Sequence, residues 1–178
     1  MLTDHLKSLS NFSTVLEIGC GFGRITRLLL SNFPEIKEYL AVDLSPDQIE
    51  NAKQYLKSAI IHKNVDLRFI VSDIQSLQLD KKYDLVISSE LLLHLPPIEI
   101  VEVMTKLAGL SNKHVINIDY FHETPTKLAP HNFLHQYEKI YNEIPSIRQV
   151  RRVPIENKKG LFKKDTKQSI FHALVSDN

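Results

Sequence analysis

Short apolar runs alternate along this chain with segments whose apolar residues recur every three or four positions. Five runs rich in branched or aromatic residues predict buried strands, at residues 14–18, 39–43, 65–71, 83–88 and 114–119. Helical spacing predicts helices at residues 24–31, from Pro46 to about residue 58, and after Pro96-Pro97. The alternation predicts an α/β fold, a mostly parallel sheet with helices on both faces.

The last third of the chain follows a different pattern. Residues 131–143 carry apolar residues at helical spacing, and residues 147–155 and 168–175 look like a closing antiparallel pair. We therefore expect one domain over residues 1–178, with seven strands of which the last is antiparallel. The long connection at residues 119–146 is a candidate substrate lid, and the segment before Thr14, with His5 and Phe12, a candidate short flap.

Three glycines follow the first strand directly and precede the first helix. Gly19, Gly21 and Gly23 would let the backbone turn sharply and approach a ligand closely. The dinucleotide fingerprint needs a glycine where this chain has Arg24, and no Gly-Lys-Ser/Thr follows for a P-loop. Glu17 adds a carboxylate that would repel a pyrophosphate. These residues predict a nucleoside-like ligand that carries positive charge and lacks a phosphate chain.

This segment, Glu17-x-Gly19-x-Gly21-x-Gly23, resembles motif I of the class I S-adenosylmethionine-dependent methyltransferases. The later elements follow in that family's order, and the resemblance extends over residues 14–175. It implies a Rossmann-like class I methyltransferase fold, a methyltransferase activity and S-adenosylmethionine as the cofactor.

The resemblance also implies which residues hold the nucleoside half of the cofactor. Asp43, at the end of the second strand, would accept hydrogen bonds from both ribose hydroxyls, which suits an acceptor-only carboxylate. Leu44 would pack on one face of the adenine and Ile74 on the other. Asp73 would bind the adenine amino group. Three acids at three successive strand ends lie on one rim of such a sheet, which favours cofactor binding over helix capping.

The methionine half of the cofactor is assigned in the same way. Glu17 would meet the methionine ammonium, Arg24 its carboxylate, and Ser89 and Glu90 would line this end, Glu90 on the substrate side. Cys20 belongs to the glycine loop as a small residue. Because it is the single cysteine, it excludes an intramolecular disulfide framework and a multi-cysteine zinc site. Its place in the cofactor loop also argues against methylation of a pyrimidine C5 by a cysteine nucleophile.

Histidines gather in the part of the chain expected to bind the acceptor. His94 follows the fourth strand and is the first candidate for a general base, as histidine titrates near neutral pH; a structural role at a turn is the alternative. His131 is the second candidate base. His131 and His135 are four residues apart and would share one face of the predicted helix. We expect substrate contacts from Tyr120, His122 and His135.

A metal site built from these histidines with Asp119 is an alternative, but their spacing matches no established metal motif, so we predict no metal.

The distribution of charge and the absence of certain motifs narrow the range of possible methyl acceptors. The chain carries 22 Lys+Arg and 21 Asp+Glu, yet residues 148–167 hold eight cations and two acids. This basic stretch indicates either a solvated hairpin or contact with a phosphate-bearing molecule. The absence of an Asn/Asp-Pro-Pro-Tyr motif argues against exocyclic base amines and glutamine side chains as acceptors, and residues 161–165 resemble a segment of methylases from bacterial surface-sugar biosynthesis.

We therefore predict methylation of a small molecule, at an oxygen of a sugar or nucleotide-sugar. An RNA or protein methyltransferase and a non-catalytic cofactor-binding subunit are the alternatives, and a homodimer that completes the pocket is a further open question. No apolar run approaches the ~18 residues of a membrane span, and we expect a cytoplasmic protein.

The first testable prediction concerns Asp43. Calorimetric titration with S-adenosylmethionine and S-adenosylhomocysteine should show binding by the wild-type protein, and Asp43→Ala should abolish it because the ribose loses its bidentate acceptor. A folded wild-type protein that binds neither compound would contradict the predicted cofactor site.

Overall fold

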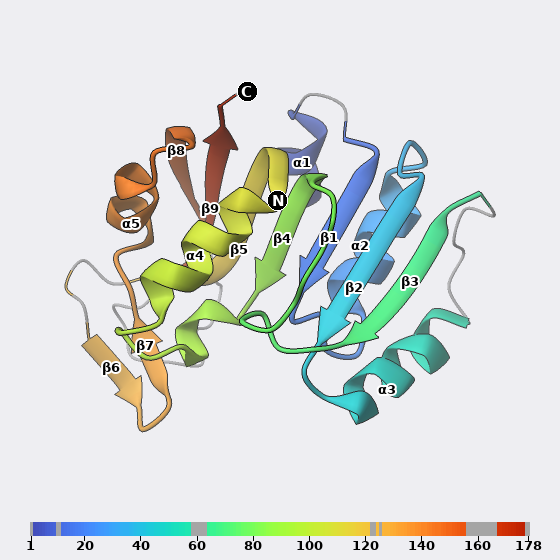
Figure 1. Cartoon of the computed structure of the whole chain (residues 1–178), viewed down its shortest axis with the longest axis horizontal. Helices are drawn as coiled ribbons and strands as arrows, with labels where there is room; N and C mark the ends of the chain where they lie inside the picture. Colours follow the sequence, from blue (N-terminus) through green and yellow to red (C-terminus); the bar gives the residue numbers. More distant parts are fainter. Residues whose placement is uncertain are drawn as a thin grey trace.

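The computed structural model describes residues 2–9, 12–57, 64–121, 124, 126–155 and 167–176 (Figure 1). The helices are α1 (Leu2–Lys7), α2 (Arg24–Asn32), α3 (Pro46–Lys57), the short 3-10 helix η1 (Leu92–His94), α4 (Ile100–Gly109) and α5 (Tyr137–Glu143). The strands are β1 (Thr14–Ile18), β2 (Glu38–Asp43), β3 (Asp66–Val71), β4 (Tyr83–Ser89), β5 (Ser111–Phe121), β6 (Thr126–Ala129), β7 (Asn132–Leu134), β8 (Ile147–Pro154) and β9 (Lys167–Val175).

Seven of the described strands form one sheet in the order β3-β2-β1-β4-β5-β9-β8. Strands β1 to β5 run parallel to one another, whereas β9 runs antiparallel to both β5 and β8. The predicted parallel sheet with an antiparallel last strand is confirmed. In Figure 1 the parallel strands all end at the lower edge, and the glycine loop begins there at the end of β1.

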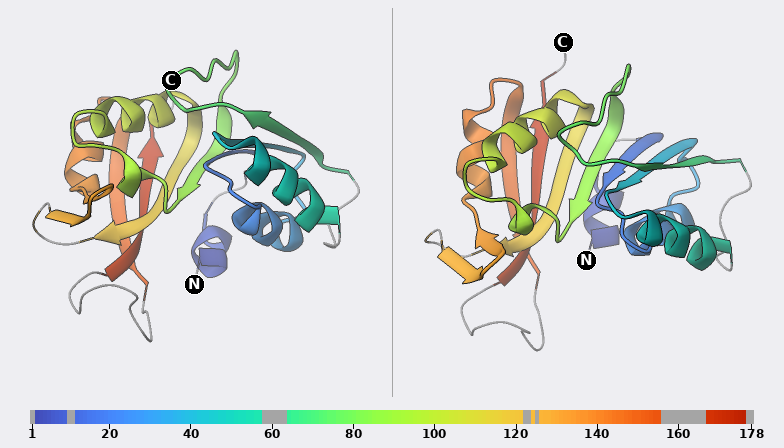
Figure 2. Two further views of the ribbon diagram at one scale, coloured as in Figure 1. Left: turned by 90° about the horizontal axis from the view of Figure 1, so that it is seen from below. Right: turned by 60° about the horizontal axis from the view of Figure 1, so that its bottom comes forward.

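Two apolar cores sandwich this sheet. The view from the lower edge in Figure 2 shows α4 and α5 on one face and α1, α2 and α3 on the other. Alternate residues of each central strand serve the two cores, as Leu16 faces α4 and Val15 faces α2. A strand buried on both faces is mainly apolar, which is why β1, β2 and β4 are rich in apolar residues, and the buried Glu17 of β1 is an exception.

The segment after β5 differs from the sequence-based prediction. A helix over residues 131–143 was expected, but β7 occupies residues 132–134 and α5 begins only at Tyr137. Strand β7 pairs with β6 in a hairpin whose turn contains Pro130 and His131. The backbone groups of β7 form their hydrogen bonds with β6, and the spacing of apolar residues could not reveal this partner strand. His131 and His135 therefore do not share a helical face, and the prediction that they do is wrong.

The residues before β1 are also placed differently. Phe12 is 2% exposed and packs on Phe33, with ring centroids 5.3 Å apart, and His5 is 9% exposed. Both belong to the layer of α1 and α2, so the expectation of a flap over the acceptor pocket is wrong. None of the described helices has the length and apolar content that a membrane crossing requires.

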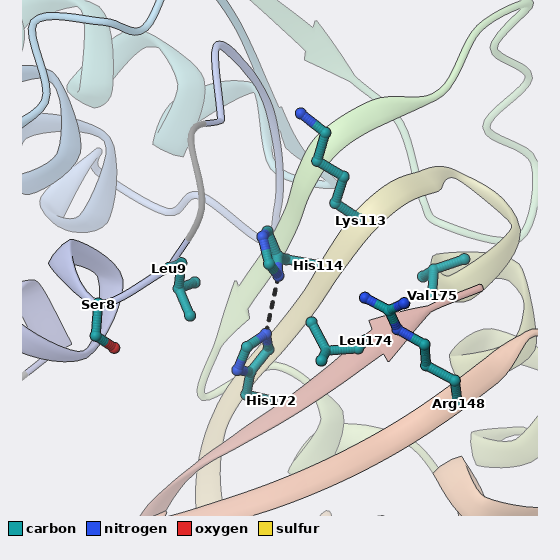
Figure 3. Close-up of a pocket in the computed structure, with 8 residues that line it drawn as sticks. All are labelled: Ser8, Leu9, Lys113, His114, Arg148, His172, Leu174 and Val175. Atoms are coloured by element: carbon teal, nitrogen blue, oxygen red, sulfur yellow. Dashed lines mark hydrogen bonds between the residues drawn. The ribbon is translucent and has the colours of Figure 1, made fainter. Parts of the chain in front are cut away.

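A pair of buried histidines joins β5 to β9 on this face. His114 Nδ1 and His172 Nε2 are 3.0 Å apart, and the two rings line a groove of about 390 Å³ near the start of β5 (Figure 3). His5 approaches His172 edge-on, with ring centroids 5.1 Å apart. Burial, followed by the neighbouring histidines and Arg151, lowers the pKa of His172 to about 3.

This lowered pKa predicts sensitivity to acid. The neutral ring favours the folded state above pH 6.5, its ordinary value, and that advantage is lost as the pH falls towards 3. Between pH 6.5 and 5 the loss is about 2 kcal/mol. Urea unfolding should show that His172→Gln loses less stability than the wild type over this range. The exposed His131→Gln is the matched control, and equal pH slopes for wild type and His172→Gln would contradict the assignment.

Candidate active site

The glycine loop turns the chain from β1 into α2 through left-handed backbone. The φ angles of Gly19, Gly21 and Gly23 are 73°, 52° and 89°, values that side chains with a Cβ rarely adopt. The N–H groups of Gly19 and Cys20 both donate to the carbonyl of Val42, at 2.8 and 3.0 Å. A Cβ added at Gly21 would meet no atom within 4 Å. The loop thus leaves open space where a ligand would lie.

Asp43, the last residue of β2, is held by this loop. Its Oδ2 accepts from Gly21 N–H at 2.8 Å and its Oδ1 from Ser45 N–H at 2.9 Å. Two backbone donors fix the carboxylate while other lone pairs stay available to a ligand. Leu44 next to it is 69% exposed, an apolar side chain at the position expected to contact an adenine. The arrangement fits the ribose and base of a nucleoside.

Asp73 lies beyond the end of β3 and caps the following turn. Its Oδ1 accepts from Ser76 N–H at 2.7 Å and its Oδ2 from the Ser76 hydroxyl at 2.5 Å. These hydrogen bonds hold the pKa of Asp73 below its ordinary value. Ile74 is 6% exposed and packs in the α4 core. The predicted contacts of Asp73 and Ile74 with adenine remain predictions beside this capping role.

Glu17 is buried beneath the glycine loop, with 2% of its surface exposed. Its Oε2 accepts from Thr26 Oγ1 at 2.5 Å and from the Tyr39 hydroxyl at 2.7 Å. Burial raises the pKa of Glu17 to about 7, although these two hydrogen bonds oppose the rise. A cation bound nearby would favour the ionised form. The carboxyl therefore fits the ammonium of a cofactor, acting from below the loop.

A second polar group lies where α2 begins, across from the end of β4. Arg24 donates to Ser89 Oγ at 3.1 Å, and its guanidinium is 4.0 Å from Glu90 Oε1. Gln168 of β9 donates to the same Glu90 oxygen at 2.9 Å. Glu90 has a φ of 54° and is the non-glycine residue of the described chain with a positive φ. Such strain is concentrated at functional sites, so this observation supports a role for Glu90.

Comparison with known proteins identifies the family to which this chain belongs. The family described as "Methyltransferase domain" matches residues 16–127, more than half of the chain. The chain belongs to this family. At the level of the domain, the predicted class I methyltransferase family, the type of enzyme and S-adenosylmethionine as its cofactor are confirmed.

Solved methyltransferases share the fold. N-methyltransferase NodS from Bradyrhizobium japonicum superposes with a TM-score of 0.76 at 20% identity, over 99% of this chain and 95% of that one. Magnesium protoporphyrin IX methyltransferase from Synechocystis, solved with S-adenosylmethionine bound, gives 0.72 at 20% identity, over 98% of this chain and 75% of that one. At such identities the similarity shows the fold alone.

Curated relatives match a shorter stretch. A malonyl-[acyl-carrier protein] O-methyltransferase from Anoxybacillus flavithermus is 43% identical over 76 residues, which are 43% of this chain and 27% of the relative. A ubiquinone biosynthesis O-methyltransferase from Rickettsia felis is 32% identical over 99 residues, 55% of this chain and 37% of the relative. The matched stretch of this methyltransferase thus spans between 27% and 37% of the length of those two proteins.

The histidines predicted to serve the acceptor do not form one group. His94 is exposed at the end of η1, and His131 is exposed in the hairpin turn. His135 is 5% exposed, its Nε2 lies 2.9 Å from the carbonyl of Leu95, and burial lowers its pKa. His122 lies outside the described residues. Tyr120 is half-buried at the end of β5, and burial followed by the charge of Glu90 raises its pKa.

The structure also bears on the role of Cys20 and on the question of a metal site. The Cys20 thiol is buried and lies 3.6 Å from the Gly21 carbonyl, and burial raises its pKa, so it is held as a thiol. Within the described part of the chain, histidine, cysteine and acidic side chains nowhere form a group of three that could hold a metal ion.

Sequence reasoning missed three partners of the predicted residues. Thr26 and Tyr39 bind Glu17, and Gln168 binds Glu90. Thr26 lies on the buried face of α2 and Tyr39 in the buried strand β2, and a hydroxyl group at such a position is a weak signal of a buried acceptor. Gln168 carried no such signal, because the antiparallel register of β9 alone brings it to this edge.

Glu17 yields a prediction about pH. Its raised pKa favours folding fully below pH 4.5, and this contribution is lost as the pH rises through about 7. Glu17→Gln should therefore gain stability relative to the wild type between pH 5 and 8, by roughly 3 kcal/mol. Urea unfolding of the cofactor-free protein measures it, with the exposed Glu35→Gln as the control. Parallel pH slopes for wild type and Glu17→Gln would show that Glu17 is ionised throughout.

Proposed function

We propose that this methyltransferase transfers a methyl group from S-adenosylmethionine to an oxygen of a small-molecule acceptor, first of all a carboxylate of an acyl thioester. The observation that carries the proposal is the cradle of the glycine loop and Asp43, in which the Gly21 N–H holds the carboxylate at 2.8 Å. Its presence in a chain of the methyltransferase family makes methyl transfer the reaction to expect.

The chain's own residues would bind and orient the reactants. S-adenosylmethionine supplies an electrophilic methyl group on a sulfonium. Asp43 would hold the ribose and Leu44 the adenine. Glu17 would stabilise the ammonium from below the loop, and Arg24 would bind the carboxylate of the methionine part. Because the reaction is an in-line displacement, alignment and exclusion of water contribute most of what the protein supplies.

The acceptor class is supported by the relatives and by the charges at the β5 end. The curated relatives include O-methyltransferases named for malonyl-[acyl-carrier protein]. A carboxylate oxygen is already nucleophilic and needs positioning rather than a base. Arg152 stacks on Phe121 at the end of β5, 4.0 Å from the ring centroid, and pairs with Glu138 at 3.5 Å. An anionic acceptor near the end of β5 would share this guanidinium with Glu138.

A sugar or nucleotide-sugar hydroxyl is the second candidate. A hydroxyl acceptor needs a general base, and His94 is exposed on the loop that follows Ser89 and Glu90. The segment at residues 161–165, which suggested a sugar, lies outside the described residues. The hairpin of β6 and β7 contacts η1, which supports the predicted lid at residues 119–146.

The nucleic-acid alternative gains less support. Most of the basic stretch lies outside the described residues. Among its described cations, Arg151 lies on the α1 face, where its charge contributes to the lowered pKa values of His5 and His172. Arg152 instead stacks on Phe121 on the α5 face. Cations divided between two faces do not form one track for a phosphate backbone. The homodimer, the non-catalytic subunit and the cytoplasmic location stay predictions.

An acceptor panel with a base variant tests the proposal. The protein with labelled S-adenosylmethionine should methylate a malonyl thioester, and His94→Asn should leave that rate nearly unchanged. If a UDP-hexose is the acceptor instead, His94→Asn should lower kcat about 10²-fold, since it removes the base. His131→Asn is the matched histidine control. No transfer to any oxygen acceptor by a protein that binds S-adenosylhomocysteine would reject the proposed reaction.

A further inference from the structure

A chain of buried hydrogen bonds lies under the loop that follows β4. The Tyr141 hydroxyl donates to Asn117 Oδ1 at 3.0 Å, and Asn117 Nδ2 donates to Asp119 Oδ2 at 2.9 Å. Asp119 Oδ1 accepts from the backbone N–H of Leu93 at 3.4 Å. All three side chains are fully buried. The chain thus connects α5, through β5, to the backbone of η1.

The loop at the end of this chain carries the acceptor-side residues. It contains Glu90, with its positive φ, and His94. Strand β5 holds it at two points, because the Glu90 N–H donates to the Ile118 carbonyl at 2.8 Å and the Leu93 N–H donates to Asp119. Of these two attachments only the second uses a side chain that can change its charge.

We infer that Asp119 is a positioning residue, which holds the loop of residues 90–94 through Leu93 in the geometry needed for methyl transfer, with Asn117 and Tyr141 as its supports. The inference rests on the proposed function, because it assigns the loop to the acceptor. Asp119 acts through the loop backbone, so its role is positioning rather than catalysis.

The hydrogen-bond chain can exist in two polarities. Ionised Asp119 accepts from Asn117, which in turn accepts from Tyr141. If Asp119 is protonated on Oδ2, the amide of Asn117 must turn so that its oxygen accepts from Asp119 and its nitrogen donates to Tyr141. Oδ1 still accepts from Leu93 in both states, but an ionised acceptor binds an N–H more strongly than a neutral one.

The surroundings of Asp119 make this change accessible near neutral pH. Burial, and to a smaller extent the charge of Glu90, raises its pKa to about 7, against the hydrogen bonds from Asn117 and Leu93. The titratable groups that face it are Glu90 from the loop after β4 and Tyr137 and Tyr141 from α5. Ionisation above about pH 7 should strengthen the hold on Leu93, so the rate of methyl transfer should rise through this pH.

The free protein allows a test that needs no acceptor. In ¹H–¹⁵N correlation spectra, the Leu93 amide should titrate with a midpoint near 7 in the wild type, whereas Asp119→Asn should remove this titration. The asparagine keeps an oxygen for Leu93, so the loop stays held. A Leu93 amide that titrates unchanged in Asp119→Asn would overturn the inference, whatever the acceptor proves to be.

Rates with the acceptor found in the panel provide the second readout. Asp119→Leu should lower kcat on the order of tenfold, because the loop loses its fixed position, and should leave the affinity for S-adenosylhomocysteine unchanged in calorimetry. Asp119→Asn should keep most of kcat and lose the rise through pH 7. An unaltered kcat in Asp119→Leu would count against the inference.

Two tyrosines of α5 give a matched pair if Asp119→Leu does not fold. Tyr141 belongs to the hydrogen-bond chain, whereas the buried Tyr137 hydroxyl has no hydrogen-bond partner among the described residues. Tyr141→Phe should raise the midpoint of the Leu93 titration, because Asn117 is no longer oriented to donate to Asp119. Tyr137→Phe should leave the midpoint unchanged. Equal effects of the two variants would contradict the inference.

Discussion

The hydrogen bond between the Gly21 N–H and the Asp43 carboxylate links the two parts of this protein that we propose recognise a nucleoside. It joins the glycine loop after β1 to the end of β2, at 2.8 Å, and the neighbouring N–H groups of Gly19 and Cys20 bind the Val42 carbonyl. A left-handed loop that no side chain stabilises would otherwise be a mobile turn. Here its shape is fixed from the adjacent strand, so the open space above Gly21 exists before a ligand binds. Preorganisation of this kind lowers the entropic cost of binding.

Two carboxyl groups buried within the sheet have their pKa raised by the same cause, which is removal from water. Glu17 and Asp119 are both buried near the edge where the parallel strands end, and burial raises the pKa of each to about 7. Their surroundings differ in kind: hydroxyl groups bind Glu17, whereas an amide and a backbone N–H bind Asp119. Glu17 lies under the glycine loop, which we propose binds the cofactor, and Asp119 lies under the loop of residues 90–94, which we propose faces the acceptor. The interior of the sheet therefore places a titratable group beneath each half of the proposed site.

Local features were predictable from the sequence, and long-range pairings were not. The glycine loop and the strands around it depend on neighbouring residues, so their position could be read from spacing. The helix predicted at residues 131–143 forms only from Tyr137 onward, because β6 supplies a partner strand for β7 and the spacing of apolar residues does not reveal that partner. Likewise the contact of Gln168 with Glu90 depends on the register of β9 against β5. The proposed cofactor half of the site is local, whereas the proposed acceptor half is assembled from distant segments.

The position of β9 has a consequence for how the domain is made on the ribosome. Strand β9 follows β8 in the chain, yet it lies between β5 and β8 in the sheet. Until β9 emerges, β5 has no neighbour on that side, and the core residues that pack against Phe171 remain open to water. Strand β8 pairs with β9 in the sheet, so it lacks its native partner strand before then. The nascent chain can thus assemble its first five strands early, but the side of the site that contains Gln168 is completed last, during which time the exposed edge of β5 is the place where a chaperone or another chain would bind.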